Sequence, residues 1–196
     1  MVSDRRGGYV SVGGLKLAAA LEAFTLDPTG WVCADLGANV GGFTDCLLQR
    51  GAARVYAVDT AYGPLAWSLR KDPRVQVMER TNALRLKDPP GPCDLVTVDL
   101  GWTPQARAIP AALAWSPTRI ISLIKPQYEQ TPPAGSRGVW DDESARRIAA
   151  ETLERLDGSA VRVVGSLPSP QRGGAGKGRA GNLETLALLV PVGGGG

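Results

Sequence analysis

The stretch Asp35-Leu-Gly-Ala-Asn-Val-Gly-Gly-Phe-Thr44 decides the fold of this 196-residue chain. It follows the apolar run 31–36, which is typical of a strand, and it leads into residues 43–50, which favour a helix. Glycines at such a turn let the backbone bend tightly and let a ligand approach without interference from Cβ atoms. The stretch therefore predicts a strand-turn-helix unit with a cofactor lying over the turn.

The residues around the turn indicate which cofactor it holds. No Gly-Lys-Ser/Thr follows the glycines, so the turn is not a P-loop, and its spacing is not the dinucleotide-binding GxGxxG. A carboxylate at Asp35 would repel a pyrophosphate, but it can hold an ammonium group directly or through water. This favours S-adenosylmethionine, bound by the turn residues Asp35, Gly37, Ala38, Asn39, Gly41, Gly42, Phe43 and Thr44.

Two further polar residues follow later strands of the same pattern. Asp59 ends the apolar strand 54–58, one βαβ unit after the turn, where it can accept hydrogen bonds from ribose hydroxyls. Asn82 follows the next strand and is a candidate for hydrogen bonding to the adenine edge. A capping or turn role for Asn82 is an equally good interpretation.

Apolar periodicity and chain-breaking residues divide the chain into alternating elements. Helices are expected over 14–24, 43–50, 64–70, 104–115 and 141–156, and strands over 31–36, 54–58, 75–78, 94–98, 119–124, 160–166 and 183–190. We expect an α/β fold with a Rossmann-like, seven-stranded methyltransferase core, mostly parallel, with the last strand antiparallel. One domain should span 1–192, with non-rigid loops at 127–137 and 171–181 and a disordered glycine tail at 193–196.

Composition limits the function further. The net charge of +3 permits a polyanionic partner such as nucleic acid without demanding one. Histidine is absent, so Ser-His and Cys-His nucleophilic schemes are excluded, and no metal site is expected. Cys33, Cys46 and Cys93 are expected to be buried free thiols, and with no apolar run of membrane-spanning length the protein is expected in the cytoplasm.

Four charged residues interrupt or end apolar segments: Lys16, Asp99, Lys125 and Glu184. Charged groups in apolar surroundings need partners. Asp99 and Lys125 end neighbouring strands of the expected sheet, at the edge where open α/β sheets bind ligands. Two lysines and two acids clustered there could align a hydroxyl with a methyl donor and accept its proton. Taken singly, each could instead be a strand-end or snorkelling surface charge.

The order of motifs resembles the haemolysin-A-like (TlyA-type) branch of the FtsJ-like ribose 2′-O-methyltransferases. The resemblance begins at YVSVGGLKL, continues through the glycine turn, and ends with RTNA, DLVTVDL, IKPQYE and GNLETLALL. It implies a catalytic tetrad of Lys16, Asp99, Lys125 and Glu184, with Lys125 acting on the hydroxyl. It also implies ribosomal RNA as substrate, methylated at a cytidine ribose. Val12 replaces the family's usual arginine, and LGWTPQ after Asp99 departs from its usual VSFI-like run.

The family carries an N-terminal S4-like RNA-binding domain, and this sequence starts almost directly at the methyltransferase motifs. RNA contacts are therefore expected from the cations Arg5, Arg6, Arg137, Arg172, Lys177 and Arg179, or from a separate RNA-binding partner. Trp102, Tyr128 and Trp140 could stack on a flipped-out nucleotide, although packing is the commoner role of aromatic residues. A small-molecule methyltransferase and a catalytically silent RNA-binding protein are the alternatives.

Overall fold

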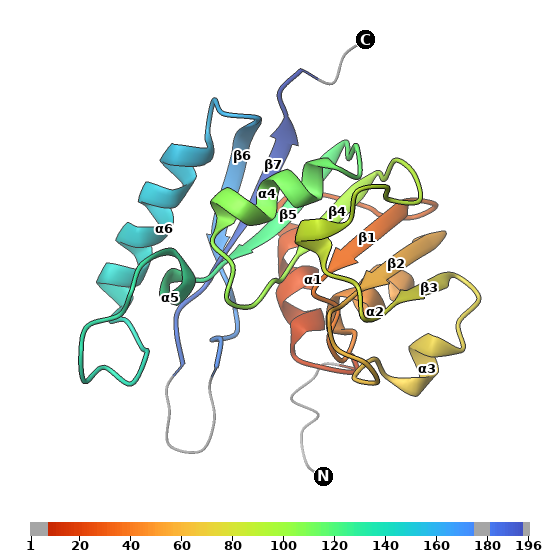
Figure 1. Ribbon diagram of the computed structural model, residues 1–196, viewed down its shortest axis with the longest axis horizontal. Coiled ribbons are helices and arrows are strands. Elements are labelled where there is room, and N and C mark those ends of the chain that lie inside the picture. Colours follow the sequence, from red (N-terminus) through yellow and green to blue (C-terminus); the bar gives the residue numbers. More distant parts are fainter. Residues whose placement is uncertain (1–7, 175–180, 194–196) are drawn as a thin grey trace.

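The computed structural model describes residues 8–174 and 181–193 (Figure 1). The helices are α1 (Gly13–Ala23), α2 (Gly42–Gln49), α3 (Trp67–Arg70), the 3-10 helix η1 (Ala83–Arg85), α4 (Gln105–Leu113), α5 (Pro126–Glu129) and α6 (Asp142–Leu156). The strands are β1 (Val32–Leu36), β2 (Arg54–Val58), β3 (Val75–Met78), β4 (Leu95–Val98), β5 (Arg119–Ile124), β6 (Val161–Pro168) and β7 (Thr185–Pro191). The expected strands and longer helices are thereby confirmed.

The strands form one seven-stranded sheet in the order β3-β2-β1-β4-β5-β7-β6. The first five strands of this order pair in parallel, and β7 runs antiparallel to both β5 and β6. The expected antiparallel last strand is confirmed. The chain reverses its direction of winding between β1 and β4, and in open α/β sheets the crevice beyond the carboxyl ends of such strands is the usual ligand site.

Helices cover both faces of the sheet (Figure 1). On one face, α1, α2 and α3 pack on the sheet around buried apolar residues such as Leu17, Leu47 and Leu69. On the other face, α4 and α6 do the same around Ile109 and Leu156. The strands β1 and β4 are buried on both faces, which explains their almost uninterrupted apolar sequence.

The helix α6 shows how local sequence sets an element. Asp141 caps its N-terminus by accepting a hydrogen bond from the Ser144 backbone N–H at 2.8 Å, and Asp142 and Glu143 add favourable charge to the first turn. Ala145, Ile148 and other small or apolar residues form the buried stripe. Among the residues described, no helix has both the length and the apolar character of a membrane span.

Two short elements differ from the expectation. Residues 127–137 were expected to form a non-rigid loop throughout, but α5 occupies its beginning because Pro126 at the first position favours a helical turn. The 3-10 helix η1 follows Asn82, whose side-chain oxygen accepts a hydrogen bond from the Leu84 N–H at 2.9 Å. Residues 175–180 and 194–196, which include most of the expected second loop and of the glycine tail, lie outside the described residues.

Candidate active site

A cavity of about 520 Å³ opens at the carboxyl ends of the central strands. Its walls come from the segments that follow β1, β2, β3, β4 and β5, with a contribution from α1 and from the start of β7. The volume lies within the range of about 300–1,000 Å³ that is typical of small-molecule sites. The lining residues that the sequence predicted are Lys16, Gly37, Asn39, Asp59, Asn82, Asp99, Lys125 and Glu184.

The glycine turn forms one wall of this cavity. Gly37 has a φ of 94°, and a Cβ at this position would lie 2.5 Å from the carbonyl oxygen of Asp99. The N–H groups of Gly37 and Ala38 both donate to the Val58 carbonyl, at 2.9 and 3.0 Å. These contacts bring the ends of β1, β2 and β4 together, and only glycine fits at position 37.

A smaller cavity of about 240 Å³ lies on the other side of the same turn. Gly37, Ala38, Asn39, Gly42 and Phe43 line it together with Lys16 and Asp99. Ser11, Val12 and Gly13 complete it from the start of α1. The sequence reasoning noted Val12 only as a departure from the family's usual arginine, and it did not single out Ser11 or Gly13. Their signal was the unusually glycine-rich entry to α1, which lets this segment approach α2 closely.

Asp35 takes a different place from the one expected. Its side chain is fully buried and does not line either cavity. The Oδ2 atom accepts hydrogen bonds from the Thr44 N–H and hydroxyl at 2.9 and 2.7 Å, and Oδ1 accepts one from the Thr97 hydroxyl at 3.0 Å. Burial raises the pKa of Asp35 to about 6, although these hydrogen bonds oppose the shift. The expected direct contact with an ammonium is therefore corrected: Asp35 fixes the start of α2 beneath the turn, and Thr44 belongs to that support.

Asp59 lies in the cavity wall beyond β2. Its Oδ2 accepts a hydrogen bond from the Asn39 N–H at 2.8 Å, and its Oδ1 accepts one from the Ala61 N–H at 2.8 Å. Each carboxylate oxygen has a second acceptor site, so hydrogen bonds to a ligand remain available. Asn82 also lines the cavity, but its Oδ1 is used to cap η1. The capping interpretation of Asn82 is thus confirmed, and its amide NH₂ group and the second acceptor site of Oδ1 are left for a ligand.

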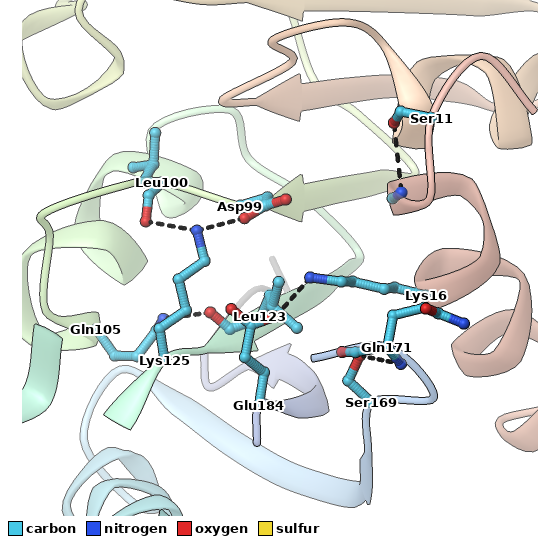
Figure 2. A network of polar contacts seen from close by, with 11 residues as sticks. Ser11, Lys16, Asp99, Leu100, Gln105, Leu123, Lys125, Ser169, Gln171 and Glu184 are labelled. Atoms are coloured by element: carbon cyan, nitrogen blue, oxygen red, sulfur yellow. Dashed lines mark hydrogen bonds and ion pairs between the residues drawn. The ribbon is translucent and has the colours of Figure 1, made fainter. Parts of the chain in front are cut away.

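Lys125 and Asp99 are brought together at the ends of β5 and β4. The Lys125 Nζ atom lies 2.5 Å from Asp99 Oδ1 and donates a hydrogen bond to the Leu100 carbonyl at 3.2 Å. Figure 2 shows the lysine side chain extending between these two acceptors. An ammonium has three N–H donors. Asp99 and the Leu100 carbonyl use two of them, so the third can face the cavity.

Lys16 and Glu184 form the second half of the cluster. Lys16 Nζ lies 2.5 Å from Glu184 Oε2, and both side chains are almost wholly buried (Figure 2). Burial raises the pKa of Glu184, whereas the nearby charges of Lys16 and Lys125 act in the opposite direction. All four expected residues therefore line one cavity as two ion pairs.

Gly173 is a residue of this site that the sequence reasoning did not single out. It pairs with Asn182 through two backbone hydrogen bonds of 3.0 and 2.8 Å, which places its Cα against the Glu184 carboxylate. A Cβ on Gly173 would lie 1.7 Å from Glu184 Oε1. Position 173 must therefore be glycine for Glu184 to face Lys16. Its only sequence signal was membership of a glycine-rich loop.

A third cavity, of about 450 Å³, adjoins the 520 Å³ cavity. The two share Trp102 and Tyr128, whose ring centroids are 5.2 Å apart. Trp102 is 87% exposed, and Lys125 Nζ lies 5.6 Å from the Tyr128 ring centroid. Trp140, in contrast, lines neither cavity, and its indole N–H is buried. For Trp140, the structure therefore supports packing, which was the commoner of the two roles considered for it.

The cations expected to bind RNA fall into three groups. Arg172 forms a two-pronged ion pair with Asp142 at 2.7 and 2.8 Å, so it is not the free loop cation that was expected. Arg137 lines the 450 Å³ cavity. The others, namely Arg5, Arg6, Lys177 and Arg179, lie outside the described residues.

Comparison with known proteins agrees with this arrangement. Residues 9–177 match the family model described as FtsJ-like methyltransferase. The chain is 42% identical over 197 residues to the 16S/23S rRNA (cytidine-2′-O)-methyltransferase TlyA of Mycobacterium tuberculosis, covering 96% of this chain and 71% of that protein. It is 31% identical to Hemolysin A of Brachyspira hyodysenteriae, covering 93% of this chain and 77% of that protein.

Solved structures show the same relationship. The crystal structure of a Lactococcus lactis protein that is provisionally named a hemolysin superposes on this chain with a TM-score of 0.84 at 34% sequence identity. The superposition covers 94% of this chain and 89% of the Lactococcus chain. The matches in sequence and in structure agree with the expected resemblance. The chain belongs to the FtsJ-like methyltransferase family.

Proposed function

We propose that this protein transfers a methyl group from S-adenosylmethionine to a ribose 2′-hydroxyl of ribosomal RNA, at a cytidine. The observation that carries the proposal is the cluster of Lys16, Glu184, Lys125 and Asp99, which lines the 520 Å³ cavity and reaches the 240 Å³ cavity through Lys16 and Asp99. The name of the Mycobacterium relative, an rRNA (cytidine-2′-O)-methyltransferase, supports the substrate. A ribosomal substrate is also consistent with a cytoplasmic location.

The cavity walls fit the proposed cofactor. Asp59 offers carboxylate oxygens for ribose hydroxyls, and the Asn82 amide NH₂, in the same cavity wall, could donate to the adenine. Gly37 lines both the 520 Å³ and the 240 Å³ cavity, and the absence of a Cβ there lets the turn pack against the Asp99 backbone beside the site. The methionine end would lie along the turn toward the 240 Å³ cavity, between Ser11 and Lys16. When bound, S-adenosylmethionine supplies an electrophilic methyl group on a sulfonium centre.

The lysines have separate roles in the proposed reaction. Lys125 is held in place by Asp99 and the Leu100 carbonyl, and its remaining position faces the cavity, where it can orient the 2′-hydroxyl. The neutral amine can accept the hydroxyl proton as the oxygen attacks. Lys16 forms an ion pair with the buried Glu184 and so balances the charge of that carboxylate beside Lys125.

The target nucleotide would enter through the 450 Å³ cavity, which adjoins the 520 Å³ cavity. Its shared wall holds Trp102, an exposed aromatic ring supported by Tyr128. Stacking on such a ring suits an unpaired base, because every base has a π-face. Recognition of the wider RNA comes from cations on this chain or from a separate RNA-binding partner.

The test is methyl transfer from labelled S-adenosylmethionine to ribosomal RNA from a strain that lacks the modification, followed by nucleoside mass spectrometry. The wild type should place label on a cytidine ribose, Lys125→Ala should transfer almost none, and Arg54→Ala, which changes an exposed cation away from the cavities, should match the wild type. Label on a base, absence of transfer, or undiminished transfer by Lys125→Ala would overturn the proposal.

A further inference from the structure

The positive charge of the chain is concentrated in one segment. Residues 61–87 contain six Lys or Arg against two Asp or Glu, a net charge of +4, whereas the whole chain carries only +3. This segment runs from the end of β2 through α3, the edge strand β3 and η1. The rest of the chain has a net charge of −1, so the segment 61–87 supplies an excess of positive charge that can attract a polyanion.

Only part of this charge is neutralised within the fold. Arg70 is paired with Glu79, and Arg74 is paired with Asp72 at 2.8 Å. These two pairs use the two acidic residues of the segment. In the described part of the chain, no carboxylate pairs with the exposed side chains of the three later cations, which are Arg80, Arg85 and Lys87.

These three residues, here called the edge cations, flank the wall of the active-site cavity. Residues 81–84 line the cavity, so Arg80 and Arg85 stand directly before and after its wall. The Arg80 guanidinium lies 4.4 Å from the ring centroid of Tyr62, which is 72% exposed. A cation held flat against an exposed ring is oriented while its donors remain available to an anion.

We propose that Arg80, Arg85 and Lys87 form a docking surface for the phosphates of the RNA strand next to the target nucleotide. The inference rests on the proposed RNA substrate and adds the surface that recognises it. The edge cations carry no carboxylate partner, they border the cavity that holds the catalytic cluster, and phosphate oxygens are the complementary charge. The sequence reasoning had assigned RNA contact to other cations.

The experiment compares two double variants of the full chain that lose the same charge. Arg85→Gln/Lys87→Gln removes two edge cations, and Arg54→Gln/Arg162→Gln removes two exposed cations from the amino-terminal ends of β2 and β6, away from the cavities. Binding to unmodified ribosomal RNA transcribed in vitro is measured by filter retention over a series of KCl concentrations. The variants touch no described ion pair, and circular dichroism checks that both fold.

The edge variant should bind the RNA several-fold more weakly, and the slope of log affinity against log salt should fall by about 1.4, because each single-strand phosphate contact contributes about 0.7. At saturating RNA its rate of methyl transfer should equal that of the wild type. The control variant should keep the wild-type slope. The Arg80→Gln variant should weaken binding in the same direction.

Equal affinity and slope in the edge and control variants would overturn the docking surface, as would a wild type that does not bind the RNA. The proposed function fails differently. A wild type that transfers no methyl group but binds RNA through the edge cations would contradict the proposed function and still support the docking surface.

Discussion

Glu184 Oε2 lies 2.5 Å from Lys16 Nζ, although 168 residues separate them in the sequence. The pair joins the first helix of the fold to the start of its last strand, and both side chains are shielded from water. A buried carboxylate and ammonium stabilise each other only as long as both are present. The pair is therefore a structural constraint as well as half of the proposed catalytic cluster.

Removing one member of this pair should lower the free energy of unfolding more than removing both members does. Lys16→Met leaves Glu184 buried without a partner, and we expect the free energy of unfolding to fall by about 3 kcal/mol at mildly alkaline pH. The double variant Lys16→Met/Glu184→Leu should recover much of that loss. Urea denaturation measures all three proteins. A double variant that is less stable than Lys16→Met would contradict the argument.

Stability should also depend on the ionisation of Asp35. Its pKa rises from 3.8 to about 6 on burial, so the folded state holds the proton to higher pH than the unfolded chain does. The contribution of Asp35 to the free energy of unfolding is fully present below pH 3.8 and is lost as pH rises through about 6. Two pKa units correspond to roughly 3 kcal/mol of unfolding free energy.

The measurement is the free energy of unfolding of the wild type and Asp35→Asn across this pH window, with the difference in slope isolating Asp35. Asp27→Asn is the contrasting control when the series is extended to lower pH, because Thr29 hydrogen bonds lower the pKa of Asp27, so that its removal should change the slope in the opposite sense and mainly below pH 3.8. Parallel curves for the wild type and Asp35→Asn would show that Asp35 does not titrate as described.

Substitution of Gly37 should separate cofactor binding from backbone strain. Gly37 and Gly30 both have positive φ, at 94° and 77°, so alanine at either position should cost about 1 kcal/mol of stability through backbone strain, and at position 37 the clash with Asp99 adds to this cost. Only at position 37 does the new Cβ meet the Asp99 carbonyl, because nothing lies within 4 Å of a Cβ on Gly30.

Calorimetry with S-adenosylmethionine should therefore show an affinity loss of at least about tenfold for Gly37→Ala and none for Gly30→Ala. Equal affinities of the two variants would remove the glycine turn from the proposed cofactor site. Comparison of their thermal unfolding shows whether both lose similar stability.

Trp102 should affect RNA and not the cofactor. Loss of one base-stacking contact costs about 1–3 kcal/mol, so Trp102→Ala should weaken RNA binding by about five- to 150-fold, while Trp102→Phe should retain most of it. S-adenosylmethionine affinity should be unchanged in both. Trp67→Ala is the matched control, since Trp67 is 69% exposed but lines neither cavity. A similar loss in Trp67→Ala would indicate a general effect of exposed aromatic residues.

Much of the fold was predictable because its signals are local. Apolar runs bounded by Gly, Pro and Asp marked each strand, and the missing helix between the last two strands predicted the antiparallel end of the sheet. Each of Lys16, Asp99, Lys125 and Glu184 stood out because charges in apolar segments require partners, but their grouping as one set came from the family resemblance.

The orientation of individual side chains was not predictable from sequence. Asp35 turns inward because the hydroxyls of Thr44 and Thr97 meet it beneath the sheet edge, and Thr97 belongs to a different strand. Gly173 matters through a contact with Glu184 that depends on tertiary packing. Arg172 is neutralised by Asp142, 30 residues away, a pairing that no local pattern indicates.

The place of β7 in the sheet has a consequence for when the protein can act. This strand inserts between β5 and β6, and Glu184 stands immediately before it. A growing polypeptide that has emerged only as far as β6 holds the glycine turn, Asp99 and Lys125, but Lys16 has no partner. The four-residue cluster is complete only after synthesis has passed residue 184, so a nascent chain that ends at β6 lacks the carboxylate that pairs with Lys16.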